Sequence, residues 1–332
     1  MSSRLKTEKA NPAGRESLLE KGIRAILEKD EAIERLIAPR SDEFISLLNR
    51  YIKEIELFNP AYGLVGALTP DELIIKHILD SLAPLGIIAR LLQFCPANTF
   101  CAANTFCAAN TFRAANTFRA ANTFRAANTF RAANTSAAAN GTAKTGSTTN
   151  TVRIADAGSG AGLPGIPLAI ALPMCSFTLI ERMERRAGFL WNTKAALGLS
   201  NVSIEEGDLE NTASGRFDLI TFRAFKPLEP KLLKSLFRAC AKTNSAADST
   251  ASGTTDSANG DNGGGADDAI GANGGTGGGA NGGVIAAYKG KLEKIRQEML
   301  PIEKYCRQWE AAPYSVPFLD EERHMVIITP PA

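Results

Sequence analysis

The chain has 332 residues, 37 of them basic and 35 acidic, so its formal net charge is +2. A chain of this length makes one large domain or two ordinary ones. So small a net charge does not produce the protein-wide positive potential that would by itself indicate binding to nucleic acid. There is no apolar leader and no run of about 18 apolar residues, so we expect a cytoplasmic protein that does not contact a membrane.

The cysteines indicate a reducing compartment. The chain has six of them, without the paired spacing of a metal site and without a compact disulfide framework. We therefore expect neither a metal nor a disulfide scaffold. They are Cys95, Cys101, Cys107, Cys175, Cys240 and Cys306.

The first part of the chain predicts helices. After a flexible stretch at 1–15, residues 16–95 place apolar side chains at intervals of three and four, which is typical of amphipathic helices. Ser41, followed by two acidic residues, predicts a helix N-cap. Thr69 predicts another, with Pro70 in the first helical position. We expect a small helical subdomain here.

Two tracts interrupt the foldable sequence. Residues 96–151 contain the unit AANTF(R/C) repeated with a period of six, which we interpret as a disordered insert because long surface insertions cost little free energy of loop closure. A six-residue period also occurs in β-helices, but each unit here offers only one large apolar side chain. Residues 243–283 are rich in Gly, Ala and Asn and predict a second flexible insert.

The remaining sequence, 152–332 without the second insert, alternates short apolar runs with helical patterns, which predicts an α/β fold with a mainly parallel sheet. The last strand follows too short a link for a helical crossover, so we expect it to run antiparallel. The predicted strands are Val152–Ala155, Ser176–Ile180, Val202–Glu205, Phe217–Phe222, Val284–Tyr288 and Met325–Thr329, with a seventh near Tyr314–Phe318, and the clearest helices are Glu184–Leu197 and Glu229–Ala241.

A glycine-rich turn follows the first predicted strand, in the sequence DAGSGAGLPGIP from Asp156. Gly158, Gly160 and Gly162 can adopt positive φ and allow a ligand to approach the backbone, while the prolines fix the start of the next helix. The spacing G-x-G-x-G, with Leu163 next, differs from the G-x-G-x-x-G of dinucleotide folds. The pattern predicts a ligand site at the carboxyl edge of the sheet.

Acidic residues follow the next two strands. Glu181 ends the run FTLIE and is expected on the loop after the second strand, about twenty residues after the glycine turn, where a carboxylate can accept hydrogen bonds from ribose hydroxyls. After the third strand, Leu209 and Glu210 stand where a side chain can flank an adenine ring and its amino group.

Six segments in this order resemble the bacterial 16S ribosomal RNA guanine-N7 methyltransferases of the RsmG type, also called glucose-inhibited division protein B. They are HILDSL, DAGSGAGLPGIPLAIALP, FTLIERMERRAGFL, LGLSNV, FDLITFRAF and ERHMVII. The resemblance covers both folded blocks and neither insert. It departs from the family at Asp208, where relatives tend to have arginine, and at Tyr62–Gly66, where they tend to have an NLT segment.

The resemblance implies a class I S-adenosylmethionine-dependent methyltransferase with a Rossmann-like sheet of seven strands, acting on N7 of one guanine in the decoding region of 16S ribosomal RNA. It implies 16S RNA or the small ribosomal subunit as the partner, and we expect a monomer that does not act on DNA. The implied cofactor-binding residues are Gly158, Ser159, Gly160, Gly162, Leu163, Glu181, Leu209, Glu210 and Arg223.

The residue types fit this chemistry. Guanine N7 has a lone pair and no proton, so its methylation needs alignment and charge placement and no general base. We expect Arg223 to position substrate or cofactor, because a guanidinium can bind a carboxylate, a phosphate or guanine O6. Cys95 and Cys240 are not expected to act as nucleophiles. The candidates for RNA contact are Arg182, Arg185, Arg186 and Lys289.

Two alternative functions remain open from the sequence. A nicotinamide-dependent oxidoreductase shares the strand, glycine turn and Glu181 pattern, and a noncatalytic ribosome-assembly factor would bind RNA without modifying it. His77 and Asp80 are one helical turn apart, and we interpret them as a packed hydrogen-bonded pair in preference to catalytic groups.

Overall fold

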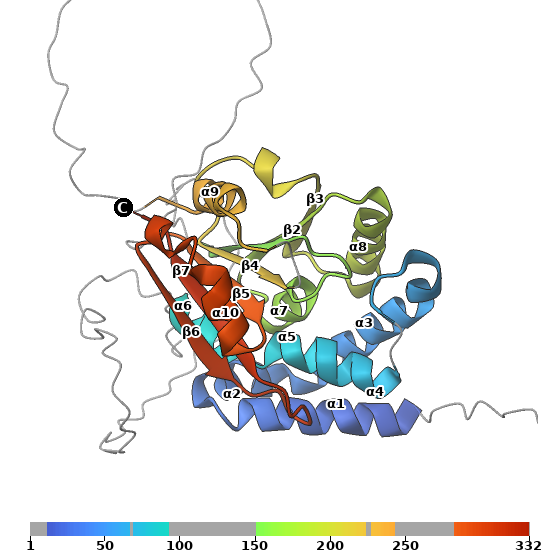
Figure 1. The fold of residues 1–332 in the computed structure, drawn as a ribbon. Coiled ribbons are helices and arrows are strands. Elements are labelled where there is room, and N and C mark those ends of the chain that lie inside the picture. The colour runs from blue at the N-terminus through green and yellow to red at the C-terminus, as the bar shows by residue number, and fades with distance from the viewer. Residues whose placement is uncertain (1–11, 67–68, 93–150, 224–226, 243–281, 332) are drawn as a thin grey trace, which may run out of the picture. The chain divides into compact units, whose positions relative to one another are not determined.

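The computed structural model describes residues 12–66, 69–92, 151–223, 227–242 and 282–331 (Figure 1). The repeat of 96–150 and nearly all of the second predicted insert lie outside these ranges, as do Cys95, Cys101 and Cys107. The described residues on both sides of the repeat belong to one compact unit.

The N-terminal segment is helical, as its periodicity predicts, although its first helix starts at Pro12, ahead of the expected residue 16. Thr69 forms a complete capping box: its hydroxyl accepts from the Glu72 N–H at 3.2 Å, and the Glu72 carboxylate accepts from the Thr69 N–H at 2.9 Å. The helices are α1 (Pro12–Leu27), α2 (Glu31–Ile37), the 3₁₀ turn η1 (Ala38–Arg40), α3 (Ser41–Tyr62), α4 (Pro70–Leu73), the π-helical η2 (Ile74–Leu79), α5 (Asp80–Leu82) and α6 (Leu85–Leu91).

The prediction of an N-cap at Ser41 is wrong. Ser41 is the first residue of α3, the residue before it is Arg40, and no side chain caps this end. The 3₁₀ turn η1 leads directly into α3, and Ser41 itself has right-handed helical dihedrals, whereas an N-cap residue needs extended ones.

The sheet has seven strands in the order β3-β2-β1-β4-β5-β7-β6, which confirms the predicted mainly parallel α/β fold. The strand β7 runs antiparallel to β5 and β6, as the short link before it predicts. The strands are β1 (Arg153–Ala157), β2 (Ser176–Glu181), β3 (Val202–Glu206), β4 (Leu219–Arg223), β5 (Val284–Lys289), β6 (Gln308–Tyr314) and β7 (Arg323–Thr329).

The seventh strand is not where the sequence places it. We predicted it near Tyr314–Phe318, and β6 overlaps that range only at Tyr314. It is an edge strand whose side chains are exposed or half-buried, and it contains Pro313. It therefore lacks the apolar run that reveals the buried strands.

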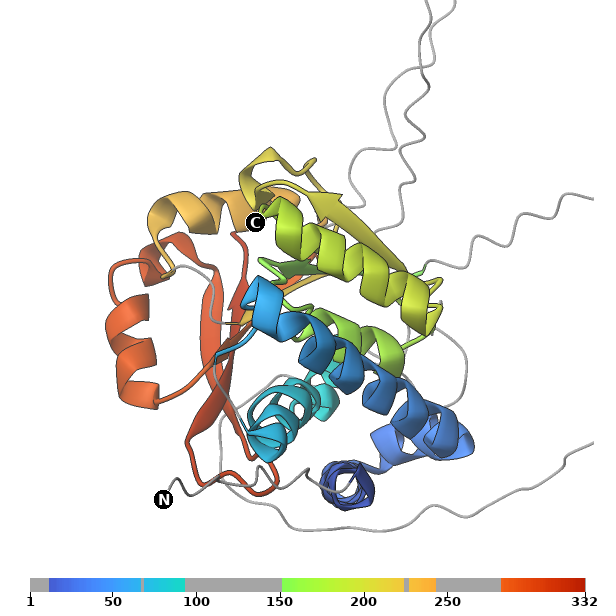
Figure 2. The same ribbon diagram turned by 90° about the vertical axis from the view of Figure 1, so that its right-hand side faces the viewer.

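Helices cover both faces of the sheet (Figure 2). The apolar side chains of α7 and α8 join those of α1–α6 in one core cluster, whereas those of α9 and α10 form a second cluster on the other face. The helix α3 packs against α7 and α8. The remaining elements are α7 (Gly165–Ala171), α8 (Glu184–Leu197), η3 (Leu209–Asn211), α9 (Pro230–Ala239), α10 (Leu292–Met299) and η4 (Glu303–Tyr305).

The sheet order reverses between β1 and β4, because β1 continues to β2 on one side and pairs with β4 on the other. In open α/β sheets, ligands bind at the carboxyl ends of the strands at such a switch point. The glycine-rich turn follows β1 at this position. Among the helices that the structure describes, none has the length and apolarity needed to cross a bilayer.

Candidate functional site

The glycine turn between β1 and α7 has the predicted left-handed backbone. Gly158, Gly160 and Gly162 have φ of 71°, 57° and 87°, a region that other residues adopt only with strain. A Cβ on Gly160 would meet nothing closer than the Gly158 carbonyl oxygen at 3.9 Å, so the space above this glycine is open. At Gly162, a Cβ would lie 2.5 Å from the Ile166 side chain, so this glycine is needed for packing.

Hydrogen bonds that involve Asp156 and Tyr51 stabilise the turn. The Asp156 carboxylate accepts a hydrogen bond from the Gly165 N–H at 3.0 Å, and the Ser159 hydroxyl donates to the Asp156 carbonyl at 2.9 Å. The Tyr51 hydroxyl, from α3, donates to the Ala161 carbonyl at 2.7 Å. Sequence reasoning missed Tyr51 as a site residue, because an apolar helical pattern treats it as core.

Asp156 has a high pKa for a carboxyl group. It is fully buried, and burial raises its pKa from 3.8 to about 7, although the Gly165 hydrogen bond and the charge of Arg223 act in the opposite direction. Its Oδ1 has no hydrogen-bond partner among the described residues, and neither has Thr221 Oγ1 on the neighbouring strand β4, opposite Asp156 in register. Two buried oxygens at the switch point therefore lack a hydrogen-bond partner among the described residues.

Glu181 binds the glycine turn directly. It is the last residue of β2, not a loop residue as predicted, and only 4% of it is exposed. One carboxylate oxygen accepts from the Gly160 N–H at 2.8 Å and the other from the Met183 N–H at 2.9 Å. Each oxygen keeps a further lone pair. The carboxylate thus lies against the turn and can still accept hydrogen bonds from hydroxyl groups.

The other residues predicted to bind the cofactor belong to the glycine turn or follow β3. Ser159 and Leu163 are buried parts of the turn itself. Leu209 is buried at the start of η3, after β3, where it joins the core cluster of α9. Glu210 is half-buried and forms an ion pair with Lys231 at 3.0 Å.

Arg223 ends β4, on the strand that neighbours β1, and only 14% of its side chain is exposed. It contacts the N-terminal helices: Nη1 donates to Asp80 and to the Lys76 carbonyl, both at 3.1 Å, and Nη2 donates to His77 Nδ1 at 2.7 Å. The sequence suggested that His77 and Asp80 bind one another, but the structure brings both to Arg223.

The candidates for RNA contact differ in their surroundings. Arg182 and Arg185 are exposed, and Arg185 lies 5.9 Å from the centre of the Tyr62 ring at the C-terminal end of α3. Arg186 is half-buried. Lys289 forms an ion pair with Glu298, with contacts of 2.7 and 2.9 Å, and 18% of its side chain is exposed.

The described cysteines have raised thiol pKa values, which disfavour the nucleophilic thiolate. Cys240 and Cys175 are buried, and burial raises the pKa of each thiol to about 12, so both are protonated at neutral pH. Cys306 also has a raised pKa, again through burial. Within the described ranges, no group of three or more metal-ligating side chains is placed to hold a metal ion.

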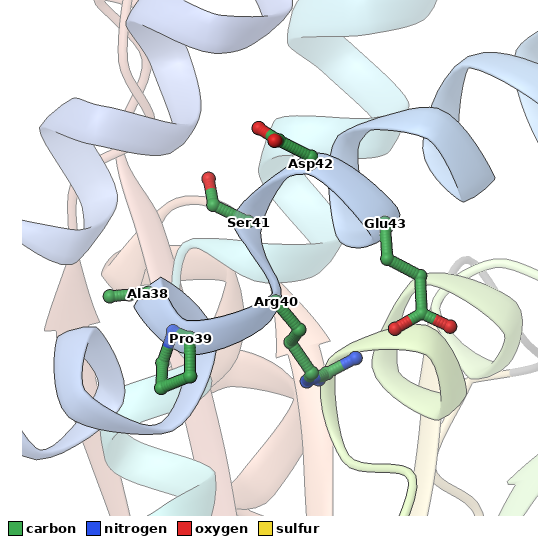
Figure 3. A pocket seen from close by; sticks show the side chains of 6 residues that line it. All are labelled: Ala38, Pro39, Arg40, Ser41, Asp42 and Glu43. Carbon is green, nitrogen blue, oxygen red and sulfur yellow. The ribbon is translucent and has the colours of Figure 1, made fainter.

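A pocket of about 350 Å³ lies elsewhere, where η1 meets α3 (Figure 3). Arg40 donates from this corner to the carbonyls of Ile170 and Ala171, at the C-terminal end of α7, whereas the glycine turn precedes the N-terminal end. Arg40 therefore satisfies the last carbonyls of α7, and the pocket is separate from the glycine turn. Its lining residues are Ala38, Pro39, Arg40, Ser41, Asp42 and Glu43.

Known proteins resemble this chain. The family described as rRNA small subunit methyltransferase G, GidB, matches residues 141–241. The ribosomal RNA small subunit methyltransferase G of Treponema denticola is 28% identical over 86% of this chain and 86% of its own length. The protein of the same name from Treponema pallidum is 36% identical over 55% of this chain and 66% of its own length. A precorrin-6y C5,15-methyltransferase structure from Geobacter metallireducens has a TM-score of 0.35 at 12% identity and covers 55% of this chain and 81% of its own.

Proposed function

Because this chain belongs to the rRNA small subunit methyltransferase G family, we propose that it is an enzyme that transfers a methyl group from S-adenosylmethionine to N7 of a guanine in the decoding region of 16S ribosomal RNA. The observation that carries the proposal is the arrangement at the switch point. The glycine turn, Glu181 and Arg223 come from three neighbouring strands and meet at one edge of the sheet.

The residues at this edge fit S-adenosylmethionine. The open space above Gly160 suits a ligand that approaches the backbone closely. Glu181 can accept from the ribose hydroxyls and Arg223 can pair with the amino-acid carboxylate, while Leu209, packed at the start of η3, is the apolar residue that we assign to the adenine. Gly158, Ser159, Gly162, Leu163 and Glu210 complete the proposed binding residues.

When bound, the cofactor supplies an electrophilic methyl group on a sulfonium centre. Guanine N7 already presents a free lone pair, so the protein has no proton to remove and must only align the two partners. The chemistry of the described side chains agrees with that requirement, because the buried thiols of Cys175 and Cys240 remain protonated at neutral pH. We assign to Arg223 the role of positioning the cofactor or substrate.

We propose that the RNA approaches over the rim formed by the start of α8 and the end of α3. Arg182 and Arg185 are exposed there, and Tyr62 lies beneath the Arg185 guanidinium. Exposed guanidinium groups pair with phosphates, and aromatic rings can stack on unpaired bases. Arg186 and Lys289 are weaker candidates, because the first is half-buried and the second is bound to Glu298.

We further propose that the substrate is 16S RNA or the small ribosomal subunit, and that the chain acts as a monomer in the cytoplasm, where ribosomes are assembled. Support for this finer assignment comes from the family's name and from the rim of exposed arginines. The family favours neither alternative raised by the sequence, the nicotinamide-dependent oxidoreductase and the noncatalytic assembly factor.

Methyl transfer tests the proposal. The purified full chain is incubated with labelled S-adenosylmethionine and with naked 16S RNA, precursor RNA or small ribosomal subunits, and the modified base is mapped by mass spectrometry. We expect 7-methylguanine at one position in the decoding region. Transfer to another atom, or binding of RNA without transfer, contradicts the proposal.

A further inference from the structure

Arg223 is held by three groups from one short helical segment that lies far away in the sequence. Its Nη1 donates to the Lys76 carbonyl and to Asp80 Oδ2, both at 3.1 Å, and its Nη2 donates to His77 Nδ1 at 2.7 Å. The segment consists of the π-helical η2 and the following α5. These contacts fix the guanidinium at two different nitrogens, so they determine its rotation as well as its position.

The His77 contact defines the state of the imidazole. Arg223 can only donate, so Nδ1 must be an unprotonated acceptor and the ring proton of a neutral imidazole is on Nε2. Burial, together with the charges of Arg223 and Lys76, lowers the pKa of His77 to about 4. Asp80 lies one turn along and is itself paired with Arg223. A neutral acceptor therefore faces Arg223 throughout the physiological range.

The segment is also anchored from the other side. Asp80 is buried, and its Oδ1 accepts from the Tyr314 hydroxyl at 3.2 Å and lies 3.4 Å from Arg323 Nε. The Tyr288 hydroxyl donates to the Ser81 carbonyl at 2.8 Å. Since β5, β6 and β7 hold the segment in this way, it forms a fixed wall against which Arg223 is oriented.

Arg223 in turn lies near the glycine turn. Its positive charge lowers the pKa of Asp156, against the larger effect of burial, and Asp156 accepts from the Gly165 N–H just after the turn. The neighbouring strand β1 leads into the turn itself. An anion that sits at the turn is therefore within the electrostatic reach of the guanidinium.

We infer that His77 is a positioning residue: by accepting from Arg223 through Nδ1, it fixes the plane of the guanidinium and thereby sets the affinity of the chain for the amino-acid carboxylate of S-adenosylmethionine. This inference rests on the proposed function. It assigns to the N-terminal helical segment a part in cofactor binding, a role that sequence reasoning did not give to His77. The residue acts through Arg223 and needs no contact with the cofactor.

Two amide substitutions separate the roles of the ring nitrogens. In His77→Asn the side-chain oxygen can occupy the position of Nδ1, whereas in His77→Gln the polar group reaches to the position of Nε2. We expect calorimetry to show that His77→Asn has a dissociation constant for S-adenosylmethionine within about twofold of that of the unaltered chain. For His77→Gln we expect a dissociation constant roughly tenfold larger. At saturating S-adenosylmethionine, methyl transfer by His77→Gln should recover.

The second of the two histidines in the chain provides a matched control. His324 is also buried, and its Nδ1 contacts the Gly290 carbonyl at 2.8 Å, so His324→Gln tests the general effect of removing a buried imidazole. We expect it to leave the cofactor affinity unchanged. Thermal melting establishes that each variant is folded. The variant Arg223→Lys, which has one donor nitrogen in place of Nη1 and Nη2, should match His77→Gln in its affinity for S-adenosylmethionine.

Equal affinities of folded His77→Asn and His77→Gln, whether both normal or both weak, overturn the role of Nδ1. Failure of the proposed function looks different, because the unaltered chain then does not bind S-adenosylmethionine, or binds it and leaves RNA unmethylated. The first of those results also overturns the inference, whereas the second leaves it standing as a statement about cofactor binding.

Discussion

Asp156 at the end of β1 and Gly165 at the start of α7 are joined by a hydrogen bond of 3.0 Å from the glycine N–H to the carboxylate. A Cβ on Gly165 would lie 2.6 Å from the same carboxylate oxygen and 2.4 Å from the Leu179 side chain. The strand and the helix approach this closely because residue 165 has no side chain. The contact therefore fixes both ends of the glycine turn.

Gly165→Ala should destabilise the protein. The added methyl group must displace the buried Leu179 side chain or Asp156, and overpacking of this kind costs about 1–3 kcal/mol. Gly188→Ala is the control, since a Cβ there meets nothing within 4 Å and alanine favours the helix α8. Urea denaturation measures both, and equal stability of the two variants contradicts the close approach.

The titration of Asp156 predicts how stability depends on pH. Its folded pKa of about 7 lies above the ordinary 3.8, so between these values the folded state binds more protons than the unfolded state, and stability falls as pH rises. Asp156→Asn removes this dependence. We expect the free energy of unfolding of the variant, relative to the unaltered chain, to rise by about 2–3 kcal/mol between pH 5 and pH 8.

The contribution of His77 to stability changes with pH in the opposite direction. Because its pKa of about 4 lies below the ordinary 6.5, this contribution rises with pH between those values. Both proteins contain His77, so its effect cancels in the difference. Urea unfolding of the two proteins at several pH values provides the measurement. A difference that does not change with pH shows that Asp156 is ionised in the folded state.

Gly160→Ala should weaken the binding of S-adenosylmethionine. The added methyl group enters the open space above the turn and forces alanine to a φ of 57°. Gly215→Ala is matched in strain, with a φ of 70° and nothing within 4 Å, and lies before the amino end of β4. Each should lose about 1–2 kcal/mol of stability. Only Gly160→Ala should lose affinity in calorimetry, and equal affinities argue against the turn as the binding site.

Removal of residues 243–281 should leave the fold intact. The Gly283 N–H donates to the Ala241 carbonyl at 2.8 Å, and the Ala241 N–H donates to the Phe217 carbonyl at 2.7 Å, so the residues flanking this tract are already joined. A short glycine-serine linker in its place closes a smaller loop, which should stabilise the protein by up to about 2 kcal/mol. Thermal melting checks this, and loss of cooperative unfolding contradicts it.

Deletion of Ala97–Asn150 should likewise leave methyl transfer largely unchanged. The described residues before and after this range belong to one compact unit, and the candidate site lies wholly within that unit. Methylation of 16S RNA by the shortened chain, compared with the full chain, is the measurement. Failure of the shortened chain to fold contradicts our interpretation of the repeat as a passive insert.

Most of the fold can be predicted from the sequence because its central strands are buried on both faces and appear as continuous apolar runs. The run at Phe217–Phe222 and the run at Val284–Tyr288 match β4 and β5 within two residues at each end. The edge strand β6 has no such signal, since half-buried polar side chains and Pro313 disguise it. The π-helical turn η2 also has no periodicity of its own to reveal it.

The site can be predicted only where it is local in sequence. The glycine turn follows β1 and Glu181 is the last residue of β2, and sequence reasoning places both at the carboxyl edge of the sheet. The contacts of Arg223 with His77 and Asp80 join residues more than 140 positions apart, and no short-range pattern encodes them. The burial of Asp156, which raises its pKa, likewise depends on helices packed from elsewhere in the chain.

The hydrogen bond between Gly283 and Ala241 has a practical consequence. It joins the chain before and after the second tract beside the amino ends of β4 and β5, whereas the glycine turn lies at their carboxyl ends. The chain can therefore exchange whatever sequence it carries between residues 242 and 282 without rearranging the strands. A fluorescent protein inserted there should therefore leave the candidate site, at the opposite end of the sheet, undisturbed.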